Sequence, residues 1–591
     1  MGTLRGIAAS QGVAIGPVFC YREVELEVVC APIADPAGEW ARLEEALSAA
    51  REELALLRAK TIEEVGEEEA AIFEAHAMML EDPELLKAVR TTIETEQVNA
   101  ECALERAAEQ YAQALEALDD EYLRARAVDV RDVTNRVLRL LLGLEQRGAK
   151  ALQKPSIVVA RDLTPSDTAL LDKSLVLGFL TAEGGPTSHT AILARSLGIP
   201  AVLGVGSAAL ALEEGETVVI DGDEGVVHVA PNAETRARYE RKQDSLAAVT
   251  VWARRQAHEP AVTEDGKRVE VVANIGNLRD ARAAIEEGAE GVGLLRTEFL
   301  YLERSDLPDE EEQAAVYAEI TDLFDGAPVI LRTLDVGGDK DLPAFDLPRE
   351  MNPFLGLRAL RLGLAHPEEI FKPQLRAVLR AAVDRNLKVM FPMVASVTEV
   401  RAARTLLETC RAELQAEGVA VPEDLEVGIM VEIPAAALMA DHLASDVDFF
   451  SIGTNDLTQY TMAADRTNAA VSYLTNGLEP AVLRLVKMVI DAAHARGKWV
   501  GMCGELAGEP LALPILLGLG LDEFSMNPPA IPIAKQILRA LSYKMAQQVA
   551  RRALELETAD EVEAFVRAEV AAVDVQYLLA LKRHKLDKDF S

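Results

Sequence analysis

The 591-residue sequence has few cysteines and no long apolar run. Its five cysteines form no Cys-x-x-Cys motif and no close pairs, a pattern typical of a reducing compartment. No stretch of about 18 consecutive apolar residues occurs, and the N-terminus lacks the basic and apolar regions of a signal peptide. The sequence therefore predicts a cytoplasmic protein without membrane insertion.

Basic residues are scarce relative to acidic ones. The chain has 60 Lys and Arg against 97 Asp and Glu, which gives a formal charge of −37. Nucleic acids and anionic membranes bind proteins through clustered cations, and no basic block offsets this acidic excess. The charge argues against both as partners and leaves a small ligand or a basic protein as alternatives.

Glycine and proline are nearly missing from residues 34–144, where Ala, Leu, Glu and Arg dominate. Apolar residues recur there at intervals of three and four, as at Leu43, Leu47, Leu54 and Leu57. This periodicity predicts a helical bundle. Short apolar runs divided by Gly and Asp precede and follow it, which indicates an α/β domain into which the bundle is inserted.

The C-terminal half alternates apolar runs with helical segments. Such alternation predicts a parallel sheet buried on both faces, and eight runs indicate a closed (β/α)8 barrel of the TIM type. An open doubly wound sheet is the alternative, but no Gly-rich dinucleotide motif follows the first run. The runs are residues 269–276, 291–299, 328–337, 388–394, 427–434, 449–457, 498–505 and 523–527.

The whole chain is thus expected to be a multidomain α and α/β protein. We assign residues 1–30 and 145–230 to the α/β domain, 31–144 to the inserted bundle, 231–260 to a helical linker, and 261–591 to the barrel with a helical tail.

Polar residues concentrate where the predicted barrel strands end. Active sites of such barrels lie on that face, so these side chains should converge. Arginines and a lysine beside carboxylates suit an anion together with a hard divalent cation. The alternative is a set of ion pairs that only stabilises the strand ends. The residues are Arg296, Glu298, Arg332, Asp335, Lys340, Glu432, Asn455, Asp456, Cys503, Glu505 and Asn527.

A second constellation is the segment GGPTSHTAILARSLGIPAV at residues 184–202. Thr187 and Ser188 are residue types that begin helices, which places His189 in a first helical turn. The free N–H groups of that turn stabilise an anion, so a phosphoryl group carried by the imidazole would be held there. A lone histidine is more often structural, and only the Gly-Gly-x-Thr-Ser context favours a nucleophile.

Cys503 is the only cysteine at a predicted barrel strand end, where a thiol could donate a proton to carbon. The other four, Cys20, Cys30, Cys102 and Cys410, are interpreted as small apolar residues of the cores.

Taken together, these segments resemble the enzyme I family of the bacterial sugar phosphotransferase system over essentially the whole chain. The resemblance includes GIAASQGVAIGP, DEYLRARAVDVRDV, GVGLLRTEFLY, LRTLDVGGDK, NPFLGLRALR, VGIMVEIPAA, SIGTNDLTQYTMAADR and GMCGELAG. Phosphoenolpyruvate synthase and pyruvate phosphate dikinase share the phosphohistidine and barrel domains. They also carry a nucleotide-binding domain, and no P-loop or comparable segment is visible here.

The resemblance implies that His189 takes the phosphoryl group of phosphoenolpyruvate and passes it to the phosphocarrier HPr, with release of pyruvate. It implies Mg2+ as cofactor and a homodimer formed through the barrel domain. The implied roles are phosphate binding by Arg296, Arg332 and Arg358, carboxylate binding by Asn455 and Arg466, Mg2+ binding by Glu432 and Asp456, with Asp456 also at the substrate, and protonation of the enolate by Cys503.

The family's helical domain docks HPr, and the matching segment here is EEEAAIFEAHAMMLEDPEL at residues 67–85. Carboxylates around an apolar spot suit a basic partner, whereas the alternative is a solvated helix face. The implied contacts are Glu67, Glu68, Met78, Met79, Asp82, Glu84 and Leu85.

The chain departs from the family at Pro186, where arginine is usual, which removes a cation near the expected phosphohistidine. Two other functions stay open from the sequence. One is a phosphoenolpyruvate synthase-like enzyme, and the other is a regulatory phosphotransferase that reports its phosphorylation state to partners.

Overall fold

The structure is a computed structural model. The chain forms two compact units, Met1–Asp244 and Ser245–Ser591. The described residues are all except 1, 11, 22–25, 27, 65–66, 117–120, 145–151, 186–187, 302–303, 305, 339–341, 343, 346–349, 467, 469–470 and 571–591. The side chains of 62–64, 67–71, 116, 121–126, 189, 192, 196, 244–250, 472 and 570 also lie outside the described part.

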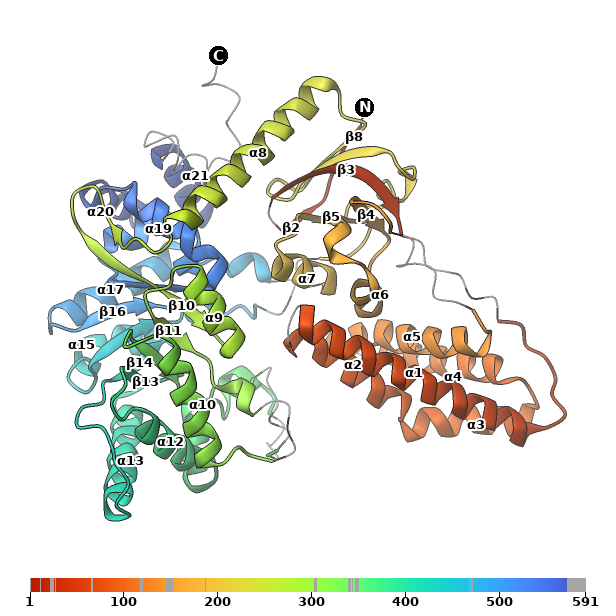
Figure 1. The fold of residues 1–591 in the computed structure, drawn as a ribbon, viewed down its shortest axis with the longest axis horizontal. Helices are drawn as coiled ribbons and strands as arrows, with labels where there is room; N and C mark the ends of the chain where they lie inside the picture. Colours follow the sequence, from red (N-terminus) through yellow and green to blue (C-terminus); the bar gives the residue numbers. More distant parts are fainter. Residues whose placement is uncertain are drawn as a thin grey trace. The chain divides into compact units, whose positions relative to one another are not determined.

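The first unit contains an eight-stranded mixed sheet in the order β1-β8-β7-β3-β4-β5-β6-β2 (Figure 1). Strands β3 and β4 are parallel neighbours, with Val18 opposite Ile157, although a helical segment separates them in sequence. The strands are β1 (Gly2–Arg5), β2 (Ile7–Ser10), β3 (Val13–Cys20), β4 (Ser156–Ala160), β5 (Val176–Thr181), β6 (Ala201–Leu203), β7 (Thr217–Asp221) and β8 (Val226–Val229).

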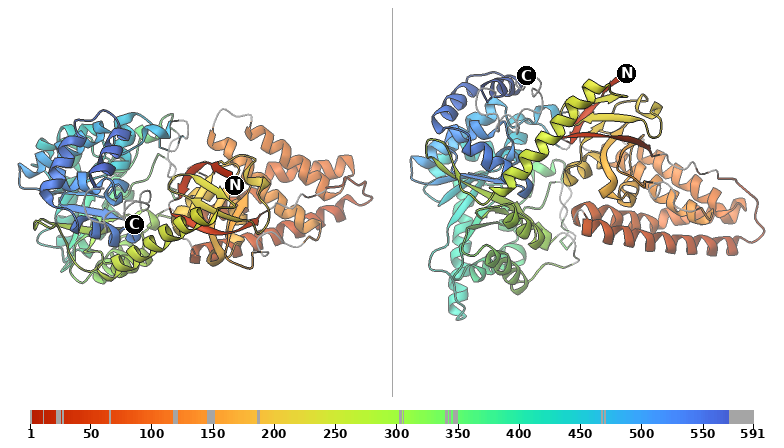
Figure 2. Two further views of the ribbon diagram at one scale, coloured as in Figure 1. Left: turned by 90° about the horizontal axis from the view of Figure 1, so that it is seen from above. Right: turned by 45° about the horizontal axis from the view of Figure 1, so that its top comes forward.

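The helical segment between β3 and β4 forms a bundle of long helices (Figures 1 and 2). Leu43, Leu54, Val89 and Val137 are buried in its core, as the spacing of three and four requires. Ala169 of α6 (Pro165–Leu170) belongs to the same core. The bundle helices are α1 (Pro36–Glu64), α2 (Glu67–Leu80), α3 (Pro83–Glu96), α4 (Ala100–Glu116) and α5 (Glu121–Leu141).

A disulfide joins Cys30 to Cys102, whose Cα atoms are 5.0 Å apart. The prediction that these two are free thiols is therefore wrong. The two segments meet at a β-bridge between Pro32 and Val98, and the Ile33 N–H donates to the Gln97 carbonyl oxygen at 2.8 Å. This pairing brings together cysteines that are 72 residues apart in sequence. Cys20, Cys410 and Cys503 take part in no disulfide.

The second unit contains a closed barrel, because β10 to β17 are parallel in chain order and β11 also pairs with β10. This confirms the predicted eight-stranded barrel. The short strand β9 (Ala261–Val262) pairs antiparallel with β10. The barrel strands are β10 (Arg268–Ile275), β11 (Val292–Leu295), β12 (Val329–Arg332), β13 (Leu387–Phe391), β14 (Val427–Val431), β15 (Phe449–Ile452), β16 (Trp499–Met502) and β17 (Glu523–Met526).

Helices follow each barrel strand, and their apolar sides are buried with the strands in one large core. The longer ones are α9 (Leu278–Glu286), α10 (Glu310–Leu323), α12 (Lys372–Ala381), α13 (Val397–Ala416), α16 (Thr454–Met462), α17 (Pro480–His494), α18 (Leu513–Leu519) and α19 (Ile531–Arg539). Helices α20 (Tyr543–Ala553) and α21 (Ala559–Val570) follow, and α8 (Ala233–Arg255) precedes the barrel. None of the described helices is long and apolar enough to cross a membrane.

Candidate functional site

The polar side chains predicted at the barrel strand ends converge at the carboxyl end of the barrel. Arg332 is the last residue of β12, and Glu432 and Cys503 follow β14 and β16 directly. Asp456 lies in the first turn of α16, just after β15. These four side chains are buried, so the polar groups of the mouth interact mainly with one another.

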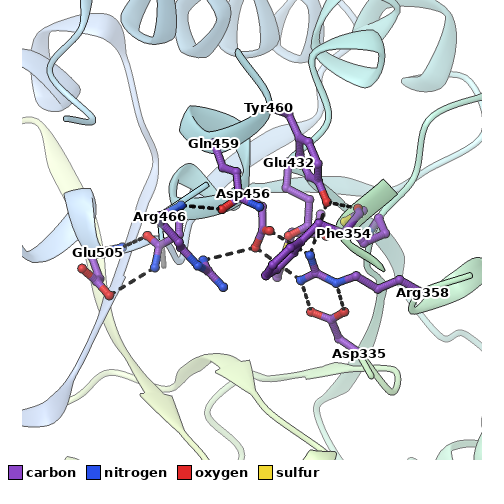
Figure 3. Close-up of polar contacts among 12 residues, drawn as sticks. Asp335, Phe354, Arg358, Glu432, Asp456, Gln459, Tyr460, Arg466 and Glu505 are labelled. Carbon is purple, nitrogen blue, oxygen red and sulfur yellow. Dashed lines mark hydrogen bonds and ion pairs between the residues drawn. The ribbon is translucent and has the colours of Figure 1, made fainter. Parts of the chain in front are cut away.

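Arg358 lies between two carboxylates (Figure 3). Its Nε and Nη2 atoms are 3.0 and 3.1 Å from the oxygens of Asp335, and its Nη1 is 2.9 Å from Asp456 Oδ1. Arg466 approaches the other oxygen of Asp456 at 3.5 Å. Only 3% of Arg358 is exposed, and the next residue, Ala359, has a φ of 54°. This left-handed backbone is costly for alanine and marks a local conformation maintained by its surroundings.

Arg332 makes a similar pair of contacts. Its Nη2 is 2.5 Å from Glu298 Oε1, and its Nη1 is 3.2 Å from Asp335 Oδ2. Burial acts to lower the pKa of Arg332, but Glu298 and Asp335 outweigh it and raise that pKa. The Nε of Arg332 is buried and has no hydrogen-bond partner among the described residues. A buried donor without an acceptor is uncommon, and here it is free to bind an anion.

Glu432 is almost fully buried beside the arginine and aspartate side chains. Its Oε1 accepts a hydrogen bond from the Met393 N–H at 2.5 Å. Gly453 leaves room for this side chain, because a Cβ there would lie 3.0 Å from Glu432 Oε2. Burial, together with Asp456 and Asp335, raises the pKa of Glu432. Burial contributes most to this shift, and Arg332 and Arg358 oppose it in part.

Cys503 is buried and belongs to an apolar cluster with Leu294, Met430 and other side chains of the barrel. Burial raises the pKa of this thiol to about 11, and the Ser451 hydroxyl partly opposes that shift. The thiol is thus protonated at neutral pH and retains a proton that it can donate.

Arg296 and Asn455 complete the predicted set on the more exposed part of the mouth. Arg296 follows β11, and its N–H donates to the Ile275 carbonyl oxygen at 2.9 Å while its side chain is exposed. Asn455 exchanges two hydrogen bonds with Glu505, at 3.2 Å through its amide nitrogen and at 2.9 Å through its carbonyl oxygen. Lys340 lies outside the described residues.

His189 is the first residue of α7 (His189–Leu197), as the sequence predicts for a histidine in a first helical turn. The Ser188 side chain caps the helix by accepting from the Ala191 N–H at 3.3 Å. Gly198, with a φ of 65°, ends the helix. The side chain of His189 and the residues Pro186 and Thr187 lie outside the described part of the chain.

The segment predicted to dock a partner protein covers α2 and the start of α3. Met78 is 69% exposed, whereas Met79 is half-buried and Leu85 belongs to the bundle core. Asp82 caps α3 by accepting from the N–H groups of Glu84 and Leu85, and Glu84 is exposed. Glu67 and Glu68 lie in α2, but their side chains are outside the described part.

Sequence reasoning placed Glu298 and Asp335 at strand ends without giving them a role, and it did not consider Gln459 and Tyr460. Asp335 contacts both Arg332 and Arg358. Gln459 accepts from the Arg466 N–H at 3.0 Å, and Tyr460 donates to the Phe354 carbonyl oxygen at 2.5 Å. All four lie in quoted motifs, but only the folded loops show what they contact.

Three family models of PEP-utilising enzyme domains match successive parts of the chain. Residues 252–543 match "PEP-utilising enzyme, PEP-binding domain", residues 5–126 match "PEP-utilising enzyme, N-terminal", and residues 152–225 match "PEP-utilising enzyme, mobile domain".

Curated relatives match nearly the whole chain. The phosphoenolpyruvate-protein phosphotransferase of Geobacillus stearothermophilus is 50% identical over 565 residues, which cover 96% of this chain and 98% of the relative. That of Bacillus subtilis (strain 168) is 49% identical over 568 residues, covering 96% and 99%. A solution structure titled Enzyme I (nEIt) is 45% identical, with a TM-score of 0.37, and covers 41% of this chain and 99% of its own. At such identity over such coverage, the chain belongs to the phosphoenolpyruvate-protein phosphotransferase family.

Proposed function

We propose that this chain transfers the phosphoryl group of phosphoenolpyruvate to His189 and then to a histidine of the phosphocarrier HPr, with release of pyruvate. This is the first step of sugar uptake by the bacterial phosphotransferase system. The observation that carries the proposal is the buried array at the barrel mouth, in which arginines alternate with carboxylates and the Nε of Arg332 has no hydrogen-bond partner among the described residues. Family membership agrees with it.

The array fits a substrate with two anionic groups. Guanidinium groups bind phosphate and carboxylate oxygens through directed donors, and they do so strongly where water is excluded. We assign phosphate binding to Arg296, Arg332 and Arg358, and carboxylate binding to Asn455 and Arg466. Arg466 Nη1 and Asp456 Oδ2 are 3.5 Å apart, which supports a role for both at the same part of the substrate.

The donor set also fits a divalent cation, with Mg2+ as the ion we propose. No group of three or more His, Cys, Asp and Glu in the described part of the chain is arranged to hold a metal alone. Mg2+ is commonly held by one or two carboxylates together with waters and substrate phosphate. Glu432 and Asp456 would supply the two carboxylates. When bound, the ion would neutralise charge on the transferring phosphoryl group.

Transfer to His189 breaks the bond between phosphorus and the enol oxygen, and the phosphoryl group joins the imidazole Nε2. The leaving enolate then takes a proton at its terminal carbon to become pyruvate. Cys503 is assigned as the donor, because its buried thiol is protonated and follows β16 directly, near Arg332 and Glu432 of the mouth. Arg332 and Arg358 balance the charge that develops at the oxygens.

Onward transfer needs a docking surface for HPr. We assign this surface to the segment with Glu67, Glu68, Met78, Met79, Asp82, Glu84 and Leu85. The strong exposure of Met78 beside acidic residues of α2 and α3 supports an apolar contact with a carboxylate rim. Leu85, being buried, would act by supporting α3.

The division of the chain at residues 30, 144, 230 and 260 is part of the same proposal. So are a homodimer formed through the barrel domain and a cytoplasmic location. Under this proposal the α/β domain carries His189, the bundle receives HPr, and the barrel binds phosphoenolpyruvate.

Incubation with phosphoenolpyruvate labelled in its phosphoryl group, in the presence of Mg2+, tests the proposal. The chain should acquire label that is stable to alkali and labile to acid, and addition of purified HPr should remove it. His189→Ala should take up no label, whereas His442→Ala, which alters an exposed histidine paired with Asp441, should label like the unaltered chain. Equal labelling of the His189→Ala variant would refute the proposal.

The same assay separates the alternatives. Turnover that requires a nucleotide would favour a synthase-like enzyme. Label that stays on His189 in the presence of HPr would favour a regulatory phosphotransferase.

A further inference from the structure

Glu298 is a buried carboxylate at the barrel mouth. It has been assigned no role in binding either the substrate or the metal. It begins a short helical turn after β11, and only 4% of it is exposed. Its Oε1 contacts Arg332 Nη2 at 2.5 Å and also accepts from the Asp335 N–H at 3.2 Å. One oxygen therefore bonds both the arginine and the backbone three residues further along the chain.

Asp335 holds the other side of the same arginine. Its Oδ2 lies 3.2 Å from Arg332 Nη1, and its Oδ1 lies 3.0 Å from the Nε of Arg358. Both terminal nitrogens of Arg332 thus face carboxylates, and its Nε is left as the buried donor without a partner among the described residues. A planar guanidinium held at two corners can present its third side in one direction only.

The backbone around Arg332 is held separately. The Thr297 hydroxyl donates to the Arg332 carbonyl oxygen at 3.0 Å, and the Leu334 N–H donates to Gln374 Oε1 at 2.9 Å. Gln374 in turn donates to Thr297 at 3.2 Å. These bonds do not involve Glu298 and would remain if the bond from the Asp335 N–H to Glu298 were weakened. A change at Glu298 should therefore alter the direction of the Arg332 side chain while the backbone at Arg332 stays in place.

We propose that Glu298 is a positioning residue that, with Asp335, directs Arg332 toward the phosphoryl group of the substrate. This inference rests on the proposed function, because it takes Arg332 as a phosphate ligand. Since Glu298 has no assigned contact with the substrate, its effect is expected to pass entirely through Arg332.

The test is Glu298→Gln, which retains the size and one acceptor oxygen of the side chain but removes its charge. The KM for phosphoenolpyruvate should rise about tenfold, the scale of one hydrogen bond to a charged group. Because KM does not depend on the fraction of folded enzyme, this readout stays valid if the variant loses stability. Glu523→Gln, at a buried carboxylate elsewhere in the barrel, is the matched control and should leave KM unchanged.

A double-mutant cycle tests whether the effect passes through Arg332. In an Arg332→Lys background, Glu298→Gln should change kcat/KM by less than about twofold, because the guanidinium that it directs is already gone. A full tenfold loss in that background, or an unchanged KM in the single variant, would overturn the inference. Failure of the unaltered chain to accept label from phosphoenolpyruvate would instead count against the proposed function.

Discussion

Glu432 at the carboxyl end of the barrel and Glu523 at the amino end are both buried, but the surroundings of these side chains differ. At the carboxyl end, Glu432 lies near other charged groups, the carboxylates of Asp456 and Asp335 and the guanidinium groups of Arg332 and Arg358. Its Oε1 is fixed by a backbone N–H. A carboxylate with charged neighbours can replace one of them by a bound ion at little desolvation cost, because the site is already polar.

At the amino end, Glu523 begins β17, just as Phe449 and Trp499 begin β15 and β16. Phe449 and Trp499 stack with ring centroids 4.6 Å apart, and Lys388 lies 5.1 Å from the Trp499 ring. The Glu523 Oε1 is buried without a hydrogen-bond partner among the described residues. Burial, with Glu270 adding to it, raises the pKa of Glu523 to about 8.

This difference shows that burial alone does not make a carboxylate functional. Both glutamates have raised pKa values, but only Glu432 has arginines, Arg332 and Arg358, among the charged groups that shift its pKa. The charged groups that shift the pKa of Glu523 are Glu270, Asp522 and Lys388. Glu523 is best described as a neutral acid that fills the core at neutral pH. Four experiments can contradict or refine this contrast.

The largest effect is expected for Glu432→Gln. The amide keeps the shape of the side chain but cannot supply the charge proposed to hold Mg2+, so kcat should fall about 10²- to 10³-fold. Rates of phosphoryl transfer at saturating phosphoenolpyruvate and excess Mg2+ measure this. Glu523→Gln should leave kcat unaltered, and a similar fall in both variants would remove the contrast between the two ends.

Cys503→Ser should lower the rate of pyruvate release about 10²-fold, because the hydroxyl is a much weaker acid than the thiol. Cys410→Ser is the matched control. Cys410 is also buried, in α13, and burial raises the pKa of its thiol to about 11 as well. We expect this control to lose stability but not turnover. Equal turnover by Cys503→Ser and the unaltered chain would show that the thiol does not donate the proton.

Glu523→Gln should change how stability depends on pH. The native carboxyl has a pKa of about 8, against 4.5 for an ordinary glutamate. It therefore stabilises the fold fully below about pH 4.5, and this contribution is lost as the pH rises through about 8. Relative to the unaltered chain, the amide variant should gain about 2–3 kcal/mol between pH 6 and pH 9. Urea unfolding of both proteins at the two pH values measures this. A difference in unfolding free energy between them that is the same at pH 6 and pH 9 would contradict the prediction.

The smallest effect is expected for Lys388→Met. Lys388 contacts the Trp499 ring and pairs with Glu426 at 2.9 Å, which together should stabilise the fold by about 0.5–1 kcal/mol. The urea midpoint should fall slightly while KM and kcat stay constant. A change in KM would mean that a substitution at the amino end of the barrel affects substrate binding at the carboxyl end.

The barrel could be predicted from sequence because its strands are apolar throughout. Every residue of β14 and β15 is buried, for instance, so both strands appear as continuous apolar runs. The strand-end positions of Arg332, Glu432 and Cys503 follow from the same pattern, since residues directly after parallel strands meet at one edge.

Other parts of the site could not be predicted in this way. Arg358 follows a short helical turn in a long loop, and it meets Asp456 across 98 residues of sequence. No periodicity places it there, and only the resemblance to a family suggested its role. The partners of Arg332 were visible as strand-end residues, but an ion pair depends on rotamers that sequence patterns do not specify. The disulfide was not predicted because Cys30 and Cys102 are brought together by one isolated β-bridge, between Pro32 and Val98, and no sequence pattern indicates that pairing.

That disulfide has a consequence for covalent topology. The bond between Cys30 and Cys102 closes the backbone between them into a ring that contains α1, α2 and α3. A protease that cuts once inside this ring leaves a single covalent molecule of unchanged mass apart from one added water. Its two pieces would migrate together on a gel without reductant and separate only after reduction, so a nicked bundle would pass unnoticed under oxidising conditions.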